Sequence, residues 1–135
     1  MTWLTLMNFS IEELRAATVT VTNALDDTGT GNGVSLREAI TSMNNGANLN
    51  ADVVATGTYG SGDMILFDIG GGGLQTISVN GSQLPPLDTA VLIDGNSQPN
   101  FAGTPLIDLD GLSAGAAANG FVLTNNKSHK SHGDR

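Results

Sequence analysis

Three short apolar runs decide the expected fold: VLIDG at residues 91–95, LIDLDG at residues 106–111 and FVLT at residues 121–124. They begin at equal steps of fifteen residues, and the first two close with Asp-Gly, which is typical of a tight turn. Similar runs, MILFDI and TISV, begin at residues 64 and 76. Such steps are too long for tight hairpins and too short for helical crossovers. Regular short strands without helices indicate a sandwich, a barrel or a solenoid, and the recurring turn favours the solenoid.

The N-terminal half adds a strand, a loop and a helix. TVTVTN at residues 18–23 alternates with the period of a strand, and DDTGTGNG at residues 26–33 is typical of a loop. Ser35 and Glu38 stand at capping-box spacing, which predicts an amphipathic helix at about 35–45. A weaker capping pattern predicts a short helix over residues 10–17. The apolar stripe of the main helix consists of Leu36, Ala39, Ile40 and Met43.

Composition limits the classes of partner. The 135 residues carry 13 acidic and five basic side chains, a net charge of −8, and three of the bases (Lys127, Lys130 and Arg135) lie in the last nine residues. An acidic body of this kind argues against nucleic acid and against anionic membrane surfaces. The chain has no cysteine, which excludes disulfides and thiolate metal sites. It has no apolar stretch long enough to span a membrane as a helix, and its first residues make a poor signal peptide.

Two segments, taken in order, resemble a known family. TVTVTN, the glycine-rich loop and VSLREAI are similar to the CSLREA-type module near the start of bacterial β-helix surface proteins, with Val34 in the position of the cysteine. The stretch from LPPLDTAVLIDG to FVLT resembles the entry into the first coils of such proteins. Together the two segments cover about residues 18–124.

The resemblance implies the N-terminal part of a right-handed parallel β-helix whose first coil is capped by the helix at 35–45. The expected organisation is an N-terminal segment (1–17), the cap and first coils (18–124) and a disordered polar tail (125–135). Since that tail cannot cover a coil, we expect a fragment of a longer protein. The implied role is a non-catalytic capping and initiation module of an extracellular, adhesin-like or surface-displayed protein.

The expected partners follow from the same reading. They are downstream coils or a second copy through the uncapped end, and a glycan or cell-surface receptor for the full-length protein; no nucleic acid and no membrane insertion are expected. Two alternative functions stay open: the N-terminal fragment of a polysaccharide lyase or hydrolase with its active site downstream, and a calcium-stabilised binding domain.

No residue is assigned to catalysis, to a cofactor or to a metal. Asp94, Asp108 and Asp110 are candidate calcium ligands, but Asp94 and Asp110 are also suited to start Asp-Gly turns. GTGNG at residues 29–33 is one residue short of a dinucleotide-binding motif, and the preceding acids would repel a pyrophosphate. His129 and His132 stand in the polar tail, where a solvated segment is the default interpretation. Arg37 is expected to be either a surface charge or the partner of Asp26 or Asp27 in a local ion pair.

Overall fold

The computed structural model describes residues 15–124 of the chain. Its elements, in order, are β1 (Thr18–Val21), α1 (Leu36–Asn45), β2 (Asp63–Phe67), β3 (Gln75–Ser78), β4 (Val91–Ile93), the short 3-10 helix η1 (Gly95–Ser97) and β5 (Ile107–Asp110). Every apolar run predicted as a strand up to residue 111 contains one. The last run, FVLT, does not form a strand: its Leu123 makes only an isolated parallel bridge with Leu87.

The helix predicted over residues 10–17 is only partly testable. Residues 10–14 lie outside the described part of the chain, while residues 15–17 are not helical. Ala16 instead forms a parallel bridge with Thr58, so this stretch leads into β1 in an extended conformation.

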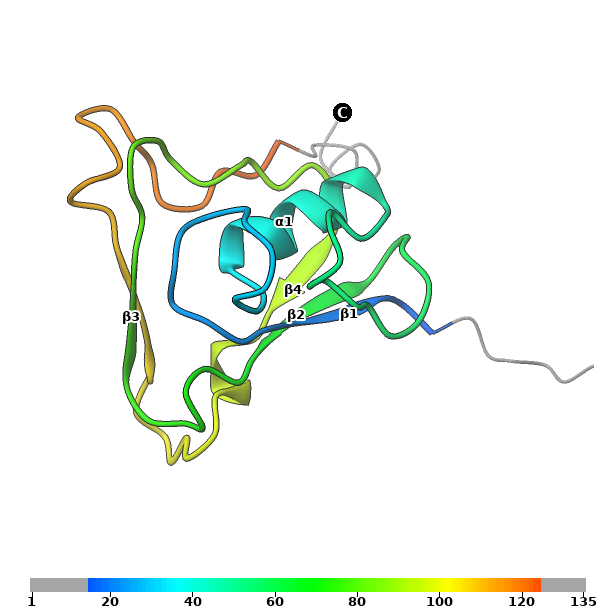
Figure 1. Ribbon diagram of the computed structural model, residues 1–135, viewed down its shortest axis with the longest axis horizontal. Helices are drawn as coiled ribbons and strands as arrows, with labels where there is room; N and C mark the ends of the chain where they lie inside the picture. Colours follow the sequence, from blue (N-terminus) through cyan, green and yellow to red (C-terminus); the bar gives the residue numbers. More distant parts are fainter. Residues whose placement is uncertain (1–14, 125–135) are drawn as a thin grey trace, which may run out of the picture.

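All paired strands run parallel. β2 lies between β1 and β4 in a three-stranded sheet, and β3 pairs with β5 in a two-stranded sheet. Viewed down its short axis, the chain encloses a roughly triangular area (Figure 1). The first sheet forms one side, the second sheet another, and the segments around residues 84–90 and 120–124 run along the third.

The predicted right-handed parallel β-helix is wrong. The described residues form two separate small parallel sheets and one α-helix, not a continuous stack of fifteen-residue units. The two runs at 91 and 106, expected in successive units, contribute β4 and β5 to different sheets. Equal spacing misleads here because pairing is decided by what each strand can bury: Ile93 stands opposite Ile65, and Leu109 opposite Ile77.

Helix α1 begins and ends as the sequence predicts. The Glu38 amide donates to Ser35 Oγ at 3.1 Å, and the Ser35 amide donates to Glu38 Oε2 at 2.8 Å, which completes the capping box. The helix ends at Gly46, whose φ of 64° is left-handed and whose amide donates to the Met43 carbonyl.

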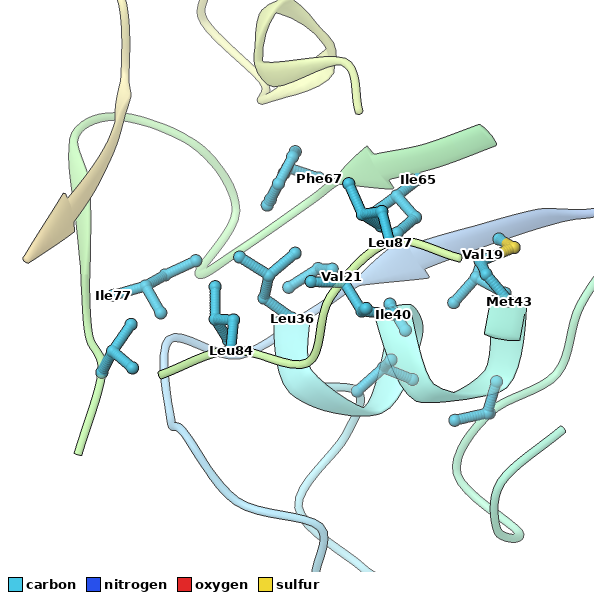
Figure 2. Close-up of a cluster of buried hydrophobic side chains, with 14 of the residues drawn as sticks. Val19, Val21, Leu36, Ile40, Met43, Ile65, Phe67, Ile77, Leu84 and Leu87 are labelled. Atoms are coloured by element: carbon cyan, nitrogen blue, oxygen red, sulfur yellow. The ribbon is translucent and has the colours of Figure 1, made fainter. Parts of the chain in front are cut away.

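The apolar stripe of α1 packs into the core, as predicted. Its four members, Leu36, Ala39, Ile40 and Met43, are at most 1% exposed. They face the inward side chains of β1 and β2, including Val19, Val21 and Ile65 (Figure 2). Val34, just before the Ser35 cap, is also buried in this cluster. The helix therefore covers one end of the apolar interior.

Candidate functional site

In three pairs of residues that stand side by side in parallel register, the later residue is apolar and faces an unfilled space. In each pair, a buried core residue stands in register with an aliphatic residue later in the chain: Ile65 with Ile93, Ile77 with Leu109, and Leu87 with Leu123. The first member of each pair is at most 4% exposed, whereas Ile93 and Leu109 are only half-buried and Leu123 is 77% exposed. The inward rows therefore continue to a surface that no other part of residues 15–124 covers.

We call this surface the end face. It surrounds a hollow of about 460 Å³, large enough for several aliphatic side chains. Leu36 of α1 and Phe67 of β2 also line the hollow, so its lining reaches the buried core. The large apolar side chains after residue 90 that line it are those of Val91, Ile93, Ile107, Leu109, Phe121 and Leu123.

The end face also has free strand edges. The Asp94 amide donates to the Ile65 carbonyl, so the backbone groups of Ile93 point away from β2. The Leu106 and Asp110 carbonyls accept from β3 and from Val79 just beyond it, so the backbone groups of Ile107 and Leu109 point away from β3. β4 and β5 are edge strands among the residues described, and unpaired strand edges are templates for further pairing.

Acidic side chains lie on all three sides of the end face. Asp94 follows β4, Asp108 and Asp110 belong to β5, and Asp88 contacts Thr124 beside Leu123. The two bases within residues 15–124 lie elsewhere: Arg37 is paired with Asp26, and Arg15 lies beside Thr58 and Tyr59. The end face therefore combines an apolar centre with a negatively charged rim.

Two of the three candidate calcium ligands serve as turn residues. Asp94 Oδ1 accepts the Asn96 amide at 3.0 Å, and Asp110 Oδ1 accepts the Leu112 amide at 2.9 Å, which confirms the turn interpretation for both. Asp108 lies on the exposed face of β5, within 3.5 Å of Thr76 Oγ1. Residues 15–124 contain no group of three or more acids and histidines able to hold a metal ion; His129 and His132 lie outside this range.

The glycine-rich loop is an anion cradle that the chain fills itself. The amides of Gly31, Asn32 and Gly33 all donate to Asp52 Oδ2, at 2.7, 3.2 and 3.2 Å. Successive amides of this kind bind phosphate in other proteins, but here a carboxylate takes the position. The role of Asp52 could not be predicted from the sequence, because the residue lies nineteen or more positions away from the loop in an irregular segment.

Buried polar side chains have structural partners, and two of them, Asp63 and Gln98, were not predicted from the sequence. Asp63 accepts the Ala17 and Gly60 amides at 2.9 and 3.0 Å. Gln98 accepts the Ile69 amide at 2.9 Å and donates to the Ile69 and Gly73 carbonyls. Glu38 accepts from Ser35 and from Asn50 Nδ2. Each satisfies backbone or side-chain groups that burial would otherwise leave unpaired.

Comparison with models of protein families, with curated proteins and with solved structures found no match to this chain. Within residues 15–124, α1 falls well short of the length and apolar character that a membrane-spanning helix requires.

Proposed function

We propose that this chain is a non-catalytic structural module that packs its end face against further polypeptide. The observation that supports this role is the coincidence of an apolar hollow with free strand edges on one surface. Apolar surface gains about 25 cal/mol for each Å² removed from water, and pairing would satisfy the unpaired edge groups as well.

The distribution of polar groups supports a structural rather than a catalytic role. The buried carboxylates of Asp63 and Glu38 are engaged by amides of the same chain, and Asp94 and Asp110 hold turns. These acids lack the open position beside a reacting atom that general acid or base chemistry needs. An extracellular, surface-displayed setting is proposed from the similarity to CSLREA-type modules of bacterial surface proteins.

The self-association of the isolated chain tests the end face. We expect copies to associate through it at high protein concentration, and association to strengthen with added salt, because salt screens the two acidic rims from each other. Sedimentation velocity at low and high salt measures this directly.

Two matched variants assign the contact. Leu123→Asn on the end face should weaken association, whereas Leu74→Asn, at a residue 68% exposed in the glycine-rich turn before β3, should leave it unchanged. A wild-type chain that stays monomeric at high concentration and high salt would contradict the proposed function. Equal association by both variants would place the contact elsewhere.

A further inference from the structure

We infer that the end face accepts an extended polypeptide segment alongside β5, with aliphatic side chains at alternate positions and Lys or Arg between them. This inference rests on the proposed function and specifies the chemistry of the partner.

The backbone of β5 sets the first requirement. Ile107 and Leu109 direct their amide and carbonyl groups away from β3, because the intervening residues are the ones that bond to it. An extended segment can pair with these groups, in the manner of peptides that add a strand to a sheet edge. A helix could fill the hollow but would leave the edge unpaired.

The side chains of β5 set the second requirement. Ile107 and Leu109 line the hollow, while Asp108 between them is exposed on the opposite face of the strand. A strand added next to β5 therefore places one row of its side chains in the hollow and the other row beside Asp108 and Asp110. Aliphatic residues suit the first row and cations the second, since opposite charges across neighbouring strands stabilise a sheet.

Charge and side-chain type favour this partner over a second copy of the chain and over the C-terminal segment. A second copy presents the same acidic rim and would bring like charges together. The C-terminal segment NNKSHKSHGDR carries cations but no aliphatic side chain, so its sequence cannot supply the row that fills the hollow. β4 is a poorer docking edge for a charged strand, because its exposed middle residue is Leu92.

Three labelled peptides test the inference against the full chain by fluorescence anisotropy, with the protein dilute enough to be monomeric. The first, acetyl-Thr-Ile-Lys-Val-Lys-Val-Thr-amide, has the proposed pattern. The second replaces both lysines with glutamate. The third has the composition of the first with its aliphatic and lysine residues grouped, which removes the alternation. We expect the first peptide to bind at least about tenfold more tightly than either control.

Charge reversal on the protein locates the contact. Asp108→Lys should invert the preference between the lysine and glutamate peptides, since Asp108 is exposed and only weakly bonded. Asp68→Lys is the matched control: its charge change is the same, but the residue follows β2 and its amide bonds to Val21 of β1. This variant should keep the wild-type preference.

Several outcomes would overturn the inference. Equal binding of the lysine and glutamate peptides would remove the cationic requirement, and equal binding of the grouped peptide would remove strand addition. If no peptide binds while Leu123→Asn still weakens self-association, the partner chemistry is wrong and the proposed function stands. If Leu123→Asn has no effect, the proposed function itself fails.

Discussion

Arg37 and Asp26 form a two-pronged ion pair that joins α1 to the loop before it. Arg37 Nε lies 2.8 Å from Asp26 Oδ1, and its Nη2 lies 2.9 Å from Asp26 Oδ2. The same guanidinium donates to the carbonyls of Gln83 and Ser82, at 3.0 and 2.8 Å. One side chain thus connects α1 to a segment more than forty residues later.

Arg37→Lys should destabilise the fold although it keeps the charge. The ammonium of lysine cannot reproduce the planar fork that meets both carboxylate oxygens and two carbonyls. The Asp26 side chain is 1% exposed, so weakening its pairing leaves a poorly compensated charge in the interior. We expect a loss of about 1 to 3 kcal/mol in the free energy of unfolding, measured by urea denaturation. Arg15→Lys, at an exposed side chain, should change the midpoint little; equal effects would contradict a specific role for the fork.

Ile40→Asp should unfold the chain or nearly so. Ile40 is fully buried in the contact between α1 and the strands, so aspartate would place an unpaired charge in the core. A loss of more than about 4 kcal/mol is expected, visible as a lowered thermal midpoint. Asn45→Asp adds the same charge to an exposed position on the same helix and should cost at most about 1 kcal/mol, from the helix dipole. An unchanged midpoint for Ile40→Asp would show that α1 does not cover the core.

The sequence predicts local features of this chain better than its long-range pairing. Ser35 and Glu38 identify the helix because capping depends on residues three positions apart, and Asp94 identifies its turn because it bonds an amide two residues on. The partner of β4 depends on which aliphatic residue it meets across the core, and nothing in the fifteen-residue spacing distinguishes β2 from β5 as that partner. The β-helix prediction was wrong because it inferred the pairing of β4 from this spacing alone.

The candidate site was predictable only in part. Sequence reasoning expected an uncovered end after FVLT, and Leu123 does lie on the end face. It could not place Leu123, Ile93 and Leu109 around one hollow, because that arrangement requires the two sheets and the Leu87 segment to meet. The acidic rim was visible as separate aspartates, but the sequence suggested a cation site rather than the border of an apolar surface.

Gly57→Ala should be much more harmful than Gly46→Ala, although both glycines have positive φ. At Gly46, φ is 64° and a methyl group would meet nothing within 4 Å, so the cost is conformational, about 1 to 2 kcal/mol. At Gly57, φ is 85° and a methyl group would lie 2.7 Å from the Arg15 carbonyl oxygen and closer still to that of Ala16. The strand-like pairing of residues 15–18 with 56–58 would have to open.

We therefore expect Gly57→Ala to lose at least about 3 kcal/mol. Urea denaturation of the two variants in parallel measures the difference between their losses. Because both positions have positive φ, this difference reports the steric contact at residue 57. Equal losses would mean that residues 15–18 and 56–58 can separate without cost to the fold.

Stability should fall at alkaline pH because of Tyr59, the only tyrosine in the chain. Burial raises the pKa of its phenol above the ordinary value of 10.0, the charge of Asp63 raises this pKa further, and a hydrogen bond with Ser42 opposes the shift. The folded chain then keeps the phenol proton at a pH where the unfolded chain has released it, so unfolding releases a proton. The free energy of unfolding must therefore decrease as the pH rises from about 10 toward the raised pKa, and below 10 the phenol contributes no pH dependence.

Phenolate absorbance measures the titration in the folded chain, and urea denaturation at several alkaline pH values measures the linked loss. Tyr59→Phe is the control: it should remove this part of the pH dependence while leaving any contribution of lysine in place. A phenol that titrates at or below its ordinary pKa in the folded wild type would contradict the prediction.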